Sequence, residues 1–165
     1  MKTIGIVGSG SWALALSKVI KNGNLIVKTR DLKKASKSFK KEENLEITDR
    51  FEDLSNCKYI FLAIPSQALR QNIKSIKKTI SVKNCIFIIC SKGVEKKTSR
   101  LMSEVFEEIL NNRFVILSGP NFSDEVIKGL PTATVLSCEK SKTAKEISLL
   151  FTQEKFRTYF NTDII

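Results

Sequence analysis

The chain has 165 residues, enough for one domain with a sizeable core, and its 42% apolar and 27% charged residues are typical of a globular protein. No apolar run is long enough to cross a bilayer, and the N-terminus reads as a strand and not as a leader peptide, so we expect a cytoplasmic protein without membrane insertion. The net charge of +11 predicts a lysine-rich surface that attracts anions. No nucleic-acid-binding motif accompanies it, so nucleic acid is not an expected partner.

Histidine is absent, which removes one common general base and metal ligand from the candidates. The four cysteines are Cys57, Cys85, Cys90 and Cys138, and none of them belongs to a CxxC pair. We therefore expect reduced thiols in the core, with no metal site and no disulfide.

Strand-like and helix-like segments alternate along the whole chain. In the first half we predict, in order, a strand at Thr3–Val7, a helix at Ser11–Lys21, a strand at Leu25–Thr29, a basic helix at Leu32–Lys41, a strand at Tyr59–Ile64 and a helix at Gln67–Lys77. In the second half we predict a strand at Cys85–Cys90, a helix at Ser99–Leu110, a strand at Phe114–Leu117, a short helix through Val126, a strand at Thr132–Leu136, a helix at Lys142–Phe151 and a possible strand at Arg157–Phe160.

Continuous apolar strands that alternate with helices are typical of a parallel sheet covered on both faces. Right-handed crossovers then produce a doubly wound α/β fold. We therefore predict one Rossmann-type domain over residues 1–165, with a mostly parallel sheet and helices on both faces.

The first candidate site is the glycine-rich stretch Gly8-Ser9-Gly10-Ser11-Trp12-Ala13, which lies between the first strand and the first helix. In such a turn the first glycine permits the tight bend, the second lets the backbone approach a diphosphate, and the helix start offers free N–H groups. A tight turn without a ligand is the alternative. The strand–turn–helix context, with a second strand and an acidic residue about 20 residues further on, favours nucleotide binding.

Arg30 and Asp31 follow the second predicted strand. An acid there accepts hydrogen bonds from the ribose of NAD, whereas an arginine holds the 2′-phosphate of NADP, so both coenzymes stay open. Asp31 is equally suited to cap the next helix.

Four unusual segments follow predicted strands, and the carboxyl ends of parallel strands meet at the edge where such sheets bind ligands. The segments are residues 8–13, 63–67, 91–93 and 118–122. Lys92 therefore begins at the ligand edge, where an ammonium can bind a phosphate or polarise a carbonyl. The Ser118-Gly119-Pro120-Asn121 turn offers backbone and amide groups there, or serves only as a turn and helix cap.

Several stretches together resemble the NAD(P)-dependent glycerol-3-phosphate dehydrogenase of the bacterial biosynthetic type. They are GSGSW at 8–12, AIPSQALR at 63–70, SKGVE at 91–95, LSGPNF at 117–122, SDEV at 123–126, GLPTA at 129–133 and FRTYFNTD at 156–163. The resemblance covers nearly the whole chain. It implies hydride transfer between a nicotinamide, of NAD or NADP, and carbon 2 of sn-glycerol 3-phosphate or dihydroxyacetone phosphate, a step toward glycerophospholipids.

The resemblance also implies roles for single residues. The residues expected to contact the coenzyme are Gly8, Gly10, Ser11, Trp12, Arg30, Asp31, Pro65, Lys92 and Ser123. Those expected to contact the phosphorylated substrate are Lys92, Gly119 and Asn121.

The chain also departs from the pattern of the family. Ala13-Leu14 stands where the family usually has Gly-Thr. The all-helical second domain of the family, with its acid/base lysine, would begin beyond Ile165, so we expect no catalytic residue in this chain, little activity, and a homodimer only together with that domain. The alternatives are a dinucleotide-binding module without catalysis and a related two-domain dehydrogenase with another hydroxy or keto substrate.

Overall fold

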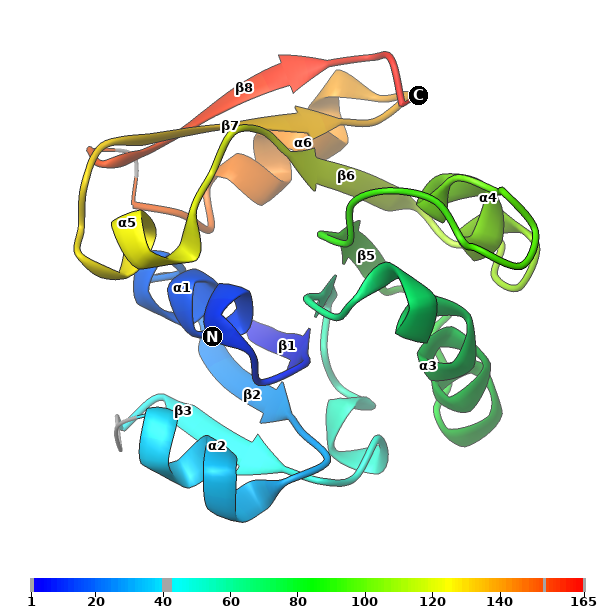
Figure 1. Ribbon diagram of the computed structural model, residues 1–165, viewed down its shortest axis with the longest axis horizontal. Helices are drawn as coiled ribbons and strands as arrows, with labels where there is room; N and C mark the ends of the chain where they lie inside the picture. Colours follow the sequence, from blue (N-terminus) through cyan, green and yellow to red (C-terminus); the bar gives the residue numbers. More distant parts are fainter. Residues whose placement is uncertain (1, 40–42, 153, 165) are drawn as a thin grey trace.

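The computed structural model describes residues 2–39, 43–152 and 154–164, which build one twisted sheet with helices around it (Figure 1). The strands are β1 (Thr3–Val7), β2 (Asn24–Lys28), β3 (Leu45–Thr48), β4 (Tyr59–Leu62), β5 (Ile86–Ile89), β6 (Phe114–Ser118), β7 (Thr132–Ser137) and β8 (Phe156–Asn161). The helices are α1 (Ser11–Val19), α2 (Leu32–Ser38), α3 (Ser66–Thr79), α4 (Met102–Glu107), α5 (Ser123–Ile127) and α6 (Ser141–Ser148), with one 3-10 turn, η1 (Glu52–Leu54).

The strand order is β3-β2-β1-β4-β5-β6-β7-β8. Within β1 to β6 every pair of neighbouring strands is parallel, and the order reverses direction between β1 and β4. The seventh strand runs antiparallel to β6, and β8 is parallel to β7. The predicted doubly wound, mostly parallel sheet is therefore confirmed, with one reversal near its end.

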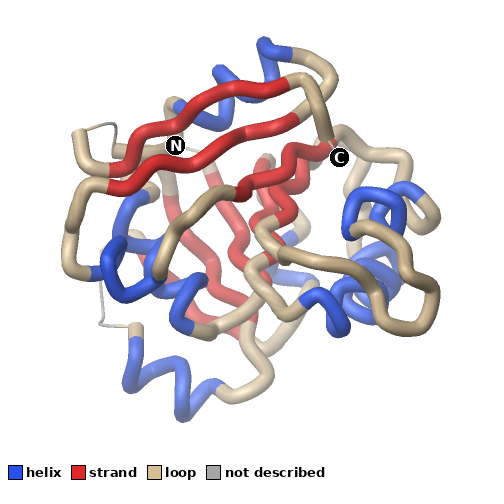
Figure 2. Tube along the Cα trace, turned by 45° about the horizontal axis from the view of Figure 1, so that its top comes forward, coloured by secondary structure: helices blue, strands red, loops and turns tan. Residues whose placement is uncertain are grey.

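Two apolar cores, one on each face, explain why the sheet is stable. Along β4, Tyr59 and Phe61 point into one core while Ile60 and Leu62 point into the other, because successive strand residues face opposite sides. Helices α1, α2, α5 and α6 cover the first face, and η1, α3 and α4 cover the second. Figure 2 shows the strands as a layer between helices. The prediction of helices on both faces is thus confirmed.

Most predicted elements are present with bounds that differ by a few residues, and the larger differences are these. The predicted helix Ser99–Leu110 is wrong at both ends: α4 begins only at Met102, since Ser99 has a positive φ of 58°, and it ends at Glu107. Strand β3 and turn η1 were not predicted. The predicted end of the second helix, at Lys41, lies outside the described residues.

The four cysteines are buried and unpaired, as expected for core thiols. Burial raises the pKa of Cys57 and of Cys90 to about 12, so both thiols stay protonated. No helix within the described ranges has the length and apolar character to cross a membrane.

Candidate functional site

The four segments singled out in the sequence lie together at the carboxyl edge of β1, β4, β5 and β6. Side chains join three of them. The Ser91 hydroxyl donates to the carbonyl oxygen of Ile64 at 2.5 Å, and the Lys92 ammonium donates to that of Gly119 at 2.6 Å. The predicted meeting of these segments is therefore confirmed by direct contacts.

Backbone packing holds the glycine turn (residues 8–13) in place. The N–H of Gly8 donates to the carbonyl oxygen of Lys28 at 2.9 Å, and Gly8 has a φ of +117°. A Cβ at this position would stand 2.3 Å from the carbonyl oxygen of Ala63. Only glycine fits both the conformation and the space.

Gly10, in contrast, faces open space. A Cβ there would meet no atom within 4 Å, and its φ of −77° is ordinary. Helix α1 begins at the exposed Ser11, with no capping side chain and no acidic residue in its first turn. The first N–H groups of this nine-residue helix therefore have no intrahelical acceptor and carry a partial positive charge. This geometry fits a diphosphate.

Two cavities flank the glycine turn. One, of about 190 Å³, is lined by residues that include Gly8, Gly10, Lys28, Arg30, Pro65 and Asn72. The other, of about 790 Å³, is lined by residues that include Gly10, Ser11, Arg30, Asp31, Lys34, Asp124 and Ile127. Six of the residues predicted to contact a coenzyme therefore surround this space.

Asp31 is partly committed to the protein itself. One of its carboxylate oxygens accepts the N–H of Lys34 at 3.0 Å and so caps α2. Arg30 is exposed, and no hydrogen bond or ion pair engages its guanidinium within the described residues. The cap interpretation of Asp31 is confirmed, and Arg30 is the freer of the two side chains.

Lys28 lines the smaller cavity, although the sequence did not single it out. The residue is only 7% exposed, and its ammonium lies over the Phe51 ring, 4.2 Å from the centroid. Loss of hydration lowers the pKa of Lys28, while nearby Asp49 opposes the shift. The signal in the sequence that could have pointed to Lys28 is its position at the end of a buried strand, which by itself is weak evidence for a binding site.

Trp12 packs its ring against the core beneath the site. A hydrogen bond from Trp12 reaches the buried Cys90, the residue that follows β5. Its indole is therefore engaged by the protein, and the backbone N–H of Trp12, in the first turn of α1, is the group left available to a ligand.

The turn after β6 presents Asn121 next to Gly119. Its Nδ2 donates to the carbonyl oxygen of Ala133 at 2.7 Å, on β7, while its buried Oδ1 has no partner among the described residues.

Ser123 begins α5, which packs against α1 (Figure 1). That packing brings Asp124 and Ile127 to the larger cavity, which the sequence did not reveal. Trp12, Lys92, Gly119, Asn121 and Ser123 do not line either cavity.

Comparison with known proteins supports the arrangement. The family described as "NAD-dependent glycerol-3-phosphate dehydrogenase N-terminus" matches residues 3–144. Glycerol-3-phosphate dehydrogenase [NAD(P)+] of Clostridium botulinum is 36% identical over the whole chain, which covers 54% of that protein. The corresponding enzyme of Corynebacterium glutamicum is 32% identical, again over the whole chain and 55% of its own length.

Solved structures agree with the sequence comparison. Glycerol-3-phosphate dehydrogenase from Coxiella burnetii has a TM-score of 0.89 and 26% identity, with 99% of this chain and 55% of that chain covered. The Plasmodium falciparum enzyme has a TM-score of 0.84 at 20% identity and covers 98% of this chain and 53% of its own. The chain thus spans about half the length of the curated relatives it matches. It belongs to the family of NAD-dependent glycerol-3-phosphate dehydrogenases and matches the N-terminal, NAD-binding part of that family.

Proposed function

We propose that residues 1–165 form a dinucleotide-binding domain that holds the coenzyme diphosphate at the glycine turn. The open space at Gly10, beside the free N–H groups that begin α1, is the observation that carries this proposal. Ser11 and Trp12 would donate their backbone N–H groups to the phosphates. The helix start adds attraction for negative charge, because no acidic side chain occupies its first turn.

The adenosine end would lie beside Arg30 and Pro65, which both line the smaller cavity. Arg30 is free to pair with a phosphate, and Lys28 adds a second positive charge to the same cavity. Asp31, the residue suited to the ribose hydroxyls, already gives one oxygen to the helix cap. These side chains favour NADPH over NADH, because a 2′-phosphate gains a charge-assisted contact that a ribose hydroxyl does not.

The substrate end would lie where Lys92 meets Gly119. The coenzyme supplies the hydride chemistry when bound. The Lys92 ammonium would contact the coenzyme, and it would also hold the phosphate of the substrate or polarise its ketone oxygen. The unpaired Oδ1 of Asn121 would accept a substrate hydroxyl. Ser123, at the start of α5, would contact the coenzyme from the opposite side.

The reaction we propose for the protein that contains this chain is the interconversion of sn-glycerol 3-phosphate and dihydroxyacetone phosphate. The names of the relatives support this substrate, and the chain covers about half of their length. Four buried, unpaired thiols favour a reducing compartment, so the cytoplasm is the proposed location.

Titration with NADPH and NADH, followed by nicotinamide fluorescence, tests the proposed diphosphate site. We expect Gly10→Asp to weaken binding of both coenzymes by about 100-fold or more, because a carboxylate would enter the diphosphate position and repel it. The open space at Gly10 lets this variant fold, which circular dichroism would verify.

Ser81→Asp is the matched control, since it adds the same charge at an exposed position before β5, on the opposite edge of the sheet. Its affinity for both coenzymes should equal that of the wild type. A folded Gly10→Asp variant that binds as tightly as Ser81→Asp would refute the proposed site.

A further inference from the structure

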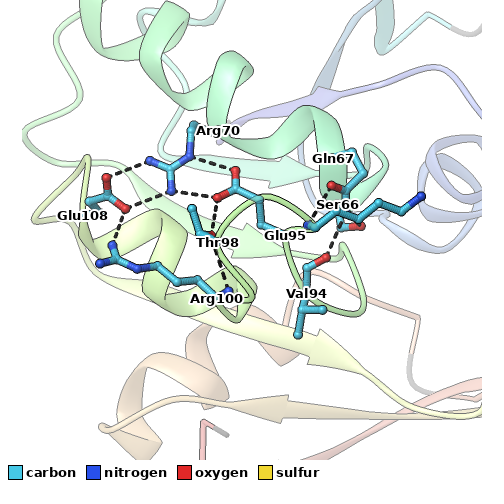
Figure 3. Close-up of polar contacts among 9 residues, drawn as sticks. Ser66, Gln67, Arg70, Val94, Glu95, Thr98, Arg100 and Glu108 are labelled. Atoms are coloured by element: carbon cyan, nitrogen blue, oxygen red, sulfur yellow. Dashed lines mark hydrogen bonds and ion pairs between the residues drawn. The ribbon is translucent and has the colours of Figure 1, made fainter.

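The loop that follows Lys92 is fastened to α3 by side chains (Figure 3). Gln67, in the first turn of α3, donates from Nε2 to the carbonyl oxygen of Val94 at 2.9 Å. Its Oε1 accepts the N–H of Lys96 at 3.0 Å. One side chain thus satisfies two backbone groups of the loop, on both sides of Glu95.

Arg70, one turn further along α3, binds Glu95 through a two-pronged contact. Its Nε and Nη2 donate to the two carboxylate oxygens of Glu95 at 2.8 and 2.9 Å. The same guanidinium donates to both oxygens of Glu108, at 2.8 and 2.9 Å. Thr98 adds a hydroxyl donor to Glu95 at 2.6 Å. Such paired contacts fix both distance and orientation.

Glu95 is only 7% exposed, although it is a carboxylate. The hydrogen bonds from Arg70, followed by the one from Thr98, lower the pKa of Glu95 to about 2. Both of its oxygens are occupied by these donors. Arg70 therefore balances the negative charge of the ionised Glu95, which lies three residues from Lys92 in the sequence. Because it is paired in this way, Glu95 does not compete with a ligand for the Lys92 ammonium.

Lys92 lies between two fastened points of the backbone. On one side the Ser91 hydroxyl bonds to Ile64, and on the other side Val94 bonds to Gln67. Gly93 turns the chain between them with a φ of +95°. Ile64 precedes Pro65 and Gln67 follows it by two residues, so the lysine backbone is tied to the segment that lines the smaller cavity.

We propose that Gln67, Arg70 and Glu95 are positioning residues that set the place and direction of Lys92 at the ligand. This inference rests on the proposed function, because it gives Lys92 a ligand to meet. The three residues, called the clamp below, touch neither of the cavities at the glycine turn. Any effect of the clamp on binding is therefore indirect, and we assign it to Lys92.

A double-mutant cycle with NADPH as the probe tests this inference. Lys92→Ala should weaken NADPH binding by about tenfold, the usual worth of a contact to a charged group. Arg70→Met and Glu95→Gln should each also weaken NADPH binding in the wild-type background. In the Lys92→Ala background the same changes should cost less than about twofold, because the side chain they position is already gone.

Arg100→Met is the matched control. Arg100 also pairs with Glu108, but among the described residues no hydrogen bond or ion pair joins its side chain to that of Glu95 (Figure 3). The variant therefore removes the same charge from the same cluster. It should bind NADPH like the wild type. Arg70→Lys keeps the charge but loses the two-pronged contact with Glu95. It should therefore bind NADPH almost as weakly as Arg70→Met does.

Two outcomes would overturn the inference alone. Either Arg70→Met and Glu95→Gln leave NADPH affinity unchanged, or they weaken the Lys92→Ala variant by the same factor as the wild type, which indicates a general loosening. If the folded wild-type chain does not bind NADPH at all, the proposed function is refuted, and the inference about the clamp, which rests on it, is refuted as well.

Discussion

The glycine turn after β1 and the clamp beside Lys92 share one sheet edge, yet the chain holds them in opposite ways. The glycine turn owes its shape to the backbone, through the close approach of Gly8 to Ala63 and the hydrogen bond to Lys28. The loop after Lys92 owes its shape to long polar side chains, above all Arg70 and Glu95. One region is bare toward solvent and the other is densely bonded.

The difference follows from what each region would present to a ligand. A diphosphate is bound by backbone N–H groups, so the best preparation is the absence of side chains in its path. A lysine ammonium sits at the end of a flexible side chain, so its direction must be fixed by what surrounds its backbone. A site that binds phosphate through backbone N–H groups therefore needs a bare, fixed backbone, whereas a site that binds it through a lysine needs side-chain contacts that fix the loop carrying the lysine.

The largest effect is expected from breaking the backbone support at Gly8. Gly8→Ala places a Cβ 2.3 Å from a carbonyl oxygen and forces alanine to a φ of +117°. We expect a loss of about 3 kcal/mol or more in the free energy of unfolding, because strain and steric overlap add. Urea unfolding followed by circular dichroism measures it.

Gly10→Ala is the matched comparison in the same turn. With a φ of −77° and no atom within 4 Å of the new Cβ, its free energy of unfolding should stay within about 1 kcal/mol of the wild type. Equal losses in the two variants would show that backbone packing at Gly8 does not hold the turn.

A smaller effect is expected at the adenosine end of the glycine-turn region. Arg30→Ala should weaken NADPH binding by about tenfold and NADH binding by less than about twofold, because the guanidinium pairs only with a 2′-phosphate. Lys37→Ala removes the same charge from α2 without lining either cavity and should change neither affinity. Equal weakening of both coenzymes by Arg30→Ala would contradict the preference for NADPH.

The fold was predictable where strands are long and buried. The uninterrupted apolar runs at Tyr59–Leu62 and Ile86–Ile89 identified the centre of the sheet. The edge strand β3 escaped prediction because Leu45–Thr48 has only four residues and is partly exposed, so its alternation is too brief to stand out. The antiparallel direction of β7 also lacks a local signal, since it depends on how the turn after Ser118 leads back along β6.

The site was predictable in its positions and not in its contacts. Strand ends placed Gly10, Lys92 and Gly119 at one edge, because the order of parallel strands decides which loops meet. The partnership of Arg70 with Glu95, 25 residues apart in the chain, depends on where α3 lies against the loop after β5. Single-sequence patterns do not encode that distance, and the same holds for Lys28 and Asp124 at the cavities.

The smallest effect is expected from acid, which acts on the clamp and spares the glycine turn. The pKa of Glu95 is lowered from 4.5 to about 2 in the folded chain, chiefly by Arg70, so its stabilisation is complete above about pH 4.5. It is lost as the pH falls through about 2, because the folded and unfolded carboxyl groups are then both protonated. The thermal midpoints of the wild type and of Glu95→Gln should therefore differ at neutral pH and converge as the pH falls from about 4.5 to about 2.

Glu46→Gln, at an exposed position on β3, is the matched control, and its thermal midpoint should follow that of the wild type at every pH. A gap between wild type and Glu95→Gln that persists unchanged at pH 2 would show that ionised Glu95 does not hold the loop, and that the clamp and the glycine turn are supported by packing alike.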